Sequence, residues 1–153
     1  MNDIEKYLDV ANKNYFKLLV IPDDVKEKSE IVAFLKKDGW NNIDVTKEVL
    51  RIVEGVPEDK KRLRVAMELE KWLNNLKADK CIFENISILF SPELGKIDPI
   101  RLIKYGFARE RRAVIMFPGH IRGDKAEYSL EGKEDHMIMD VSEVVCYSSK
   151  GGK

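Results

Sequence analysis

Short apolar runs alternate with amphipathic stretches along most of the chain. The apolar runs, which have the length and composition of buried strands, cover residues 16–21, 81–86 and 113–117, and residues 40–45 can supply a further short strand. Apolar positions recur at helical spacing over residues 30–37, 46–53, 57–76 and 100–108, and a short polar helix is expected over residues 3–13. Strands that alternate with helices are typical of βαβ units. The pattern therefore predicts an α/β fold with a mostly parallel sheet covered on both faces.

Particular residues mark where two of the predicted helices begin. Thr46 is the expected N-cap of the helix over residues 46–53, because its hydroxyl can accept a backbone N–H bond. Pro57 fits the first position of the next helix, because a backbone N–H group at that position has no acceptor within the helix and proline has no such group.

The pattern changes after Pro118-Gly119. Residues 125–130 and 137–147 alternate between apolar and polar side chains, which predicts a C-terminal antiparallel hairpin at the edge of the sheet. Residues 149–153 are expected to form a flexible tail, and residues 1–148 a single domain.

Composition narrows the class of protein. The chain has 27 Lys and Arg against 27 Asp and Glu, so binding to nucleic acid would need a local basic patch. No apolar run approaches the roughly 18 residues that span a bilayer, and the N-terminus lacks an apolar signal segment. We therefore expect a cytoplasmic protein without a membrane partner. Cys81 and Cys146 lie in strand-like runs and are expected to be buried, reduced thiols.

The segment Pro22–Ser29 lies between a predicted strand and a predicted helix, where nucleotide-binding proteins carry the phosphate-binding loop GxxxxGK[ST]. In that motif, backbone N–H groups surround a phosphate, Lys contacts its charge and Ser or Thr holds Mg²⁺. Lys28 and Ser29 stand at the last two motif positions, but Pro22 and Glu27 replace both glycines. Either Lys28 and Ser29 bind ATP and Mg²⁺, or they only begin a helix.

The residues that stand in place of the two glycines disfavour phosphate binding. Glycine permits a left-handed backbone and close approach, whereas proline has no amide hydrogen. Asp23, Asp24 and Glu27 also bring carboxylates toward the place of the phosphate. One carboxylate–phosphate contact near ~4 Å costs about 4 kcal/mol at an effective dielectric constant of about 20. A micromolar ligand has only about 8 kcal/mol of binding free energy. We therefore expect a degenerate loop.

An acidic residue, Glu84, follows the apolar part of the run over residues 81–86. P-loop enzymes place a carboxylate at a strand end to hold Mg²⁺ or polarise water, so Glu84 is a candidate catalytic residue and, with Ser29, a candidate Mg²⁺ ligand. The alternative is a solvated carboxylate. Helix, strand and helix separate Ser29 from Glu84, as a sheet with an added strand between the two sites requires.

The cluster Arg109-Glu110-Arg111-Arg112 precedes the last buried strand. A guanidinium there can reach a γ-phosphate, a neighbouring subunit's site in a homo-oligomer, or nucleic acid. Arg109 is the candidate catalytic arginine. Alternatively, the cluster only complements the negative end of a helix macrodipole.

The sequence of residues 83–94 is Phe-Glu-Asn-Ile-Ser-Ile-Leu-Phe-Ser-Pro-Glu-Leu, and it continues through residues 97–103 with a helix opened by Asp98-Pro99. With its residues in this order, the chain resembles the BrxF family, the small P-loop-containing proteins of type 3 BREX (bacteriophage exclusion) systems. The similarity extends to residues 42–50 and 108–119 and covers about residues 15–148. Many relatives have a proper Walker A loop and an Asp where this chain has Glu84.

The resemblance implies a P-loop NTPase-like three-layer sandwich that belongs to an anti-phage defence system. Its expected partners are a large ATPase, a DNA methyltransferase, a helicase and an alkaline-phosphatase-like protein. With the altered loop, we expect an adaptor or regulator of that complex. Two alternatives stay open. One is an active ATP-hydrolysing switch, and the other is a nucleic-acid-binding accessory protein that uses Arg109, Arg111, Arg112 and Arg122.

Overall fold

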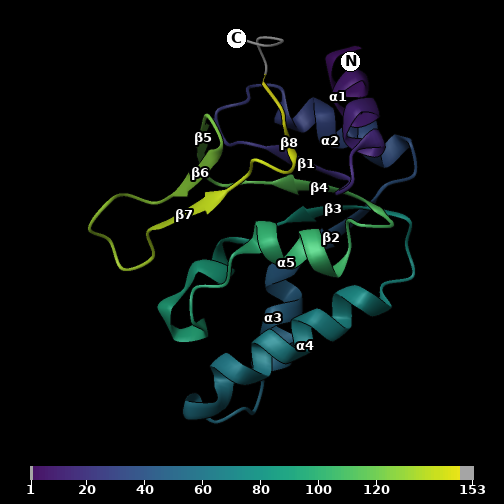
Figure 1. The fold of residues 1–153 in the computed structure, drawn as a ribbon. Helices are drawn as coiled ribbons and strands as arrows, with labels where there is room; N and C mark the ends of the chain where they lie inside the picture. Colours follow the sequence, from purple (N-terminus) through teal and green to yellow (C-terminus); the bar gives the residue numbers. More distant parts are fainter. Residues whose placement is uncertain (1, 149–153) are drawn as a thin grey trace.

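The structure is a computed structural model that describes residues 2–148 (Figure 1). The tail predicted over residues 149–153 lies outside the described residues. The helices are α1 (Asn2–Lys13), α2 (Lys28–Lys37), α3 (Val45–Val53), α4 (Lys61–Asn75) and α5 (Pro99–Gly106). Short 3-10 turns cover Glu58–Lys60, Ser87–Phe90 and Pro92–Leu94. The strands are β1 (Leu18–Ile21), β2 (Asn41–Asp44), β3 (Lys80–Glu84), β4 (Arg112–Met116), β5 (His120–Arg122), β6 (Lys125–Tyr128), β7 (Met137–Asp140) and β8 (Val145–Cys146).

Five parallel strands form the main sheet in the order β2-β3-β4-β1-β8. The predicted α/β class with a parallel sheet is thus confirmed. β4 lies between β1 and β3, with Leu18 opposite Ala113 and Phe83 opposite Ile115. One strand therefore separates the strand before Lys28 from the strand that ends at Glu84, as the sequence pattern requires.

Helices cover both faces of the main sheet. Leu18 and Val20 of β1 point into a core shared with α3, α4 and α5, whereas Leu19 and Ile21 point into a core shared with α1 and α2 (Figure 1). Every residue of β1 is buried. A strand buried on both faces explains why this segment is a continuous apolar run instead of an alternating one.

The C-terminal hairpin pairs as predicted, but it does not lie at the edge of the main sheet. β6 and β7 are antiparallel, and with β5 they form a separate three-stranded sheet. Residues 145–146 leave this hairpin and form β8, which pairs in parallel with β1. The small sheet buries Ala126 and Met139 in the core on the α3–α5 face, so alternation identified the strands but not the sheet to which each belongs.

The first turn of α3 corrects the predicted N-cap. Asp44, not Thr46, caps this helix, and its Oδ1 accepts the backbone N–H of Lys47 at 3.2 Å. Thr46 instead donates its hydroxyl to the carbonyl of Asn85 at 2.7 Å. β2 therefore runs directly into α3 without a loop. The predicted helix after Pro57 begins as a 3-10 turn, and α4 starts only at Lys61.

None of the helices within residues 2–148 is long and apolar enough to cross a membrane.

Candidate functional site

A cavity of about 560 Å³ opens at the carboxyl edge of the main sheet, where β1, β3 and β4 end. From the carboxyl ends, the chain leaves β1 toward α2 on one face of the sheet and leaves β3 toward α5 on the other face. Connections that leave on opposite faces open a crevice at the carboxyl ends of the strands, where open α/β sheets bind ligands. Lys28, Ser29 and Glu84 all line this cavity, so the structure brings these three predicted site residues together.

The loop over residues 22–29 has the backbone of a simple turn. None of these residues has a positive φ. The amide of Asp23 donates to the carbonyl of Gly119 at 2.9 Å, so this N–H group is already used within the protein. Anion-binding nests need alternating right- and left-handed residues that point successive N–H groups at one place. The loop lacks this geometry, as expected from the absence of glycine at residues 22 and 27.

Lys28 is paired within its own loop. Its Nζ lies 2.6 Å from Oδ1 of Asp23, and the two side chains are 37% and 63% exposed. An ion pair at this exposure contributes only about 0–1 kcal/mol, so a phosphate could displace it. The displacement would leave the Asp23 carboxylate uncompensated beside the phosphate, at a cost of about 4 kcal/mol at close range. The repulsion, and not the ion pair, decides against a phosphate.

Glu27, which stands where the phosphate-binding motif has its second glycine, adds a further negative charge beside the start of α2. Its Oε1 is buried and has no hydrogen-bond partner within the described part of the chain. Burial raises the pKa of the Tyr147 phenol, and the charge of Glu27 adds to this shift. Glu27 is also the N-cap residue of α2, yet its side chain caps no backbone N–H group.

Glu84 is held in place across the edge of the sheet. Its Oε1 accepts the side-chain amide of Asn42 at 2.7 Å, and β2 pairs Asp44 opposite Glu84. The next residue, Asn85, has a positive φ of 55° and turns the chain along the cavity. Sequence reasoning missed Asn42 and Thr46 as partners of this segment, because only the register of β2 against β3 reveals them.

Mg²⁺ ligands were predicted at Ser29 and Glu84. Both residues line the cavity, but one Glu84 oxygen is already used by Asn42. Among residues 2–148, no group of three or more His, Cys, Asp or Glu side chains is placed to hold a metal ion.

The arginine cluster lies at the opposite edge of the sheet. β4 begins at Arg112, whereas Glu84 ends β3 in the same parallel sheet. Arg109 therefore does not share the cavity with Glu84 in one chain, and it could reach such a site only in another subunit. Arg111 points inward to backbone carbonyls at the end of α4, and Arg112 lies beside Trp40. Arg109 is exposed, so the three arginines lie in different surroundings and do not form a single site.

The two cysteines are free thiols, buried at Cys81 and half-buried at Cys146. Burial raises the pKa of each to about 11. Neither is a thiolate nucleophile near neutral pH.

Comparison of the chain with protein-family models, with curated proteins and with solved structures finds no match in any of the three.

Proposed function

We propose that this protein is a P-loop NTPase-like adaptor of a type 3 BREX anti-phage system, and that it does not hydrolyse ATP. The observation that supports this best is the cavity at the carboxyl edge of the sheet. Lys28, Ser29 and Glu84 line it at the places where a P-loop enzyme carries its nucleotide site, yet Lys28 is tied to Asp23 of its own loop.

The residues of the loop do not fit a triphosphate. Three features act together, namely the absence of left-handed residues, the carboxylate of Asp23 and the buried carboxyl oxygen of Glu27. The carboxylate of Asp23, which lines the cavity, would alone cost about 4 kcal/mol beside a phosphate, about half of the binding free energy of a micromolar ligand. A scaffold that keeps the sheet and loses the phosphate chemistry acts through its surfaces.

The segment that carries the resemblance to the BrxF family forms one wall of the cavity. Glu84, Asn85 and Ser87 line it, and Leu89 and Phe90 behind them are fully buried. This link between the recognised segment and the cavity supports the assignment to the defence system. The other BREX proteins, above all the large ATPase, are the proposed partners.

Calorimetric titration with Mg-ATP and Mg-ADP tests the loop. We expect no saturable heat from the native protein or from Lys28→Ala. The double variant Asp23→Asn/Glu27→Gly removes both carboxylates and restores a glycine, so it should gain weak ATP binding. Asp24→Asn is the matched control, because Asp24 lies in the same loop and is exposed. Saturable binding to the native protein that Lys28→Ala abolishes would establish the ATP-dependent switch instead.

A phage-plating assay tests the assigned system. In cells that carry a type 3 BREX operon, deletion of this protein should abolish defence, and Lys28→Ala should restore it as fully as the native protein. Loss of defence with Lys28→Ala would favour the ATPase. Full defence in the deletion strain would remove the protein from the system.

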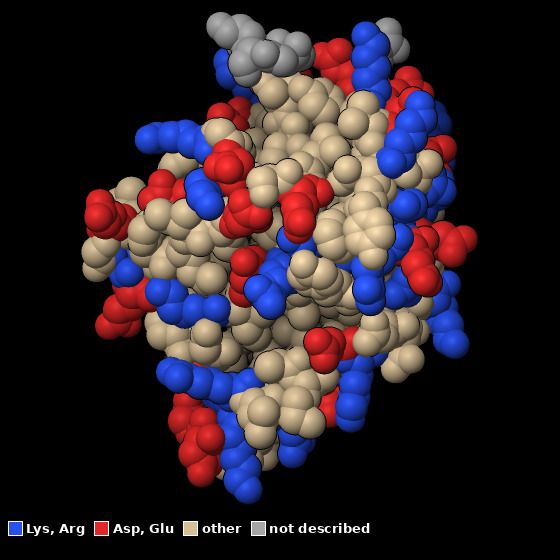
Figure 2. Space-filling view, in the orientation of Figure 1, with Lys and Arg blue, Asp and Glu red and all other residues tan. Residues whose placement is uncertain are grey.

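The nucleic-acid alternative finds less support. Positive and negative side chains are interspersed over the face in Figure 2, and the Arg111 guanidinium is used by backbone carbonyls. Strongly salt-dependent DNA binding that is lost when Arg109 and Arg122 become alanine would reinstate this role.

A further inference from the structure

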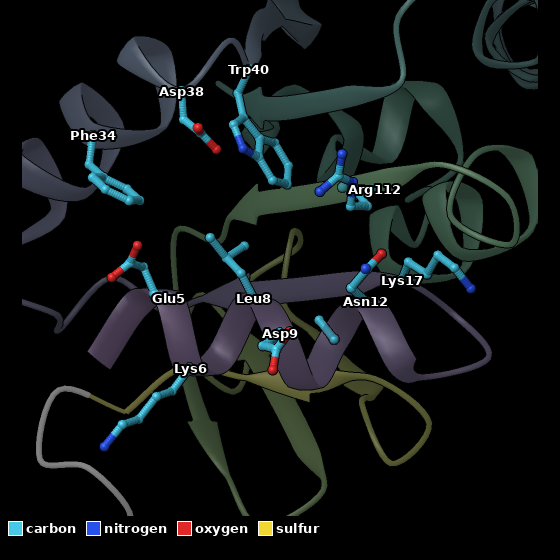
Figure 3. A pocket seen from close by; sticks show the side chains of 12 residues that line it. Glu5, Lys6, Leu8, Asp9, Asn12, Lys17, Phe34, Asp38, Trp40 and Arg112 are labelled. Carbon is cyan, nitrogen blue, oxygen red and sulfur yellow. The ribbon is translucent and has the colours of Figure 1, made fainter. Parts of the chain in front are cut away.

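A second cavity, of about 570 Å³, lies at the amino edge of the main sheet between α1 and α2 (Figure 3). It is as large as the cavity at the carboxyl edge and falls in the usual size range of ligand pockets. Its walls come from separate parts of the chain: α1, the end of α2, Trp40 before β2, and Arg112 at the start of β4.

The middle of this cavity is apolar and aromatic. Trp40 is 94% buried, since its exposed fraction is 6%, and Leu8 of α1 points toward its indole ring across the cavity (Figure 3). Phe34 of α2 lines the same space and is half-buried. The half-buried Leu8 and Phe34 side chains provide most of the apolar surface against which a flat group can pack, and only the small exposed edge of Trp40 adjoins it.

One end of the cavity presents hydrogen-bond donors. Arg112 has no carboxylate within ion-pair distance among the described residues, and its guanidinium lies 5.9 Å from the centre of the Trp40 ring. The side chain of Asn12 extends from α1 toward it in Figure 3. A half-buried guanidinium without an anion is a natural partner for a carboxylate, which it can bind with two parallel hydrogen bonds.

The other end presents carboxylates. Glu5 and Asp38 lie on the far side of Leu8 and Trp40 from Arg112 (Figure 3). Asp38 is 3.5 Å from Nζ of Lys80, and the nearby Asp9 is 3.4 Å from Nζ of Lys13. Glu5 has no such cation among the described residues. Among the described residues, Glu5 is thus the carboxylate without a cation at this end, and Arg112 the cation without a carboxylate at the other.

The indole nitrogen of Trp40 is a further polar atom of this cavity. Nε1 is buried and has no hydrogen-bond acceptor within the described part of the chain. An unpaired buried donor is destabilising. A ligand oxygen could satisfy it after a small shift of the half-buried Leu8 or Phe34 side chain.

We propose that this cavity binds a small dipolar ligand: a carboxylate at Arg112, a flat apolar middle between Leu8, Phe34 and the exposed edge of Trp40, and an amine near Glu5. The proposal is independent of the loop over residues 22–29, which lies at the opposite edge of the sheet.

Three probes of similar size and shape test it, namely 4-(aminomethyl)benzoate, 4-methylbenzoate and 4-methylbenzylamine. The protein has two tryptophans, so Trp72→Phe leaves Trp40 as the only indole fluorophore. We expect saturable quenching of Trp40, with dissociation constants of the order of 1 mM for ligands of this size, and the tightest binding for the dipolar probe. Equal affinity for all three probes, or no saturation by any, would overturn the proposal.

Two variants separate the two ends. Arg112→Gln should weaken both benzoates about tenfold, the usual effect of losing a charged hydrogen bond, and leave 4-methylbenzylamine unaffected. Glu5→Gln should weaken the two amines about threefold, because Glu5 is exposed, and spare 4-methylbenzoate. A variant that weakens all three probes equally would contradict the assigned orientation.

Two controls match these charge changes. Lys37→Gln removes a positive charge from the end of α2 outside the cavity. Asp3→Asn removes a negative charge from α1 outside the cavity. Neither should change any affinity. An unchanged thermal midpoint for each variant excludes an effect through unfolding.

Discussion

At the scale of single residues, Arg111 stabilises the fold instead of contributing a surface charge. Its guanidinium donates to the carbonyls of Leu76 at 2.7 Å and Leu73 at 2.9 Å, where α4 ends. It also lies 4.1 Å from the centre of the Phe107 ring. The last carbonyls of a helix lack hydrogen-bond donors within the helix, and a cationic side chain at this end can donate to them.

Arg111→Ala should lower the free energy of unfolding by about 2–3 kcal/mol, because it removes the guanidinium donors to the carbonyls of Leu73 and Leu76 and a cation–π contact. Arg109→Ala is the control, since Arg109 is exposed, and it should change stability by less than about 0.5 kcal/mol. Urea unfolding measures both. Equal effects of the two substitutions would show that Arg111 has no special role.

Glu127 is a second residue whose importance the sequence does not reveal. Its carboxylate contacts Nε2 of His136 at 2.7 Å and Nε2 of His120 at 3.1 Å. The hydrogen bonds with His136 and, to a lesser degree, with His120 hold the pKa of Glu127 below its ordinary value of 4.5. The folded state therefore binds fewer protons at this group than the unfolded state does.

A depressed carboxyl pKa contributes stability that is present above pH 4.5 and is lost as the pH falls through the folded value. Glu127→Gln should therefore be less stable than the native protein at pH 6, and the difference should disappear at lower pH. Urea unfolding across this pH range measures it, with Glu131→Gln as the exposed control. A difference that does not change with pH would refute the linkage.

At the scale of elements, α5 shows how a short helix is fixed at its start. The side chain of Asp98 accepts the backbone N–H of Arg101 at 3.0 Å, and Pro99 occupies the first turn. Burial is the largest influence on Asp98 and raises the pKa of its carboxyl. The charged form is thus less favourable in the fold than in the unfolded chain, although the cap itself stabilises the helix.

Asp98→Ala should cost about 1 kcal/mol of stability through the lost cap. Asp98→Asn keeps a capping oxygen and removes the buried charge, so at pH 7 it should be at least as stable as the native protein. Chemical unfolding of the two variants side by side is the measurement. Equal destabilisation by Ala and Asn would mean that the charge, and not the cap, matters at this position.

Local patterns predicted most elements but not their partners. β1 and β4 were recognisable because strands buried on both faces are continuous apolar runs, and Asp98-Pro99 signals the start of α5. The cap at Asp44 was missed because Asp44 is also the last residue of β2. Thr46 does not cap the helix because its hydroxyl donates to the carbonyl of Asn85 instead, a contact that the sequence does not reveal. Lys28, Ser29 and Glu84 were correctly grouped by spacing, whereas the pairing of Lys28 with Asp23 is a matter of side-chain geometry.

At the scale of the whole molecule, Gly119 lies where the main sheet meets the small one. A Cβ atom there would lie 2.1 Å from the carbonyl oxygen of Glu127 and 2.8 Å from the Phe117 ring. The carbonyl of Gly119 also accepts the amide of Asp23. One glycine thus joins β6, the end of β4 and the loop before α2 in close contact.

Gly119→Ala should cost about 3 kcal/mol or more, since backbone must move to admit the methyl group. Gly123→Ala is the control: its φ is +57° with open space around the Cβ position, so about 1 kcal/mol of conformational cost is expected. Thermal unfolding compares them, and amide exchange at Asp23 should accelerate only in Gly119→Ala. Similar losses of stability in both variants would show that the backbone around Gly119 moves easily to admit a methyl group.

The strand order has a consequence for how the chain folds during synthesis. β1 leaves the ribosome early, but its two neighbours come late, since Leu18 pairs opposite Ala113 and Leu19 opposite Val145. Parallel pairing between such distant segments is slow, and unpaired strand edges in nascent chains invite aggregation. β1 therefore stays apolar and without a lateral partner until β4 has been made, and without its second partner until β8 follows.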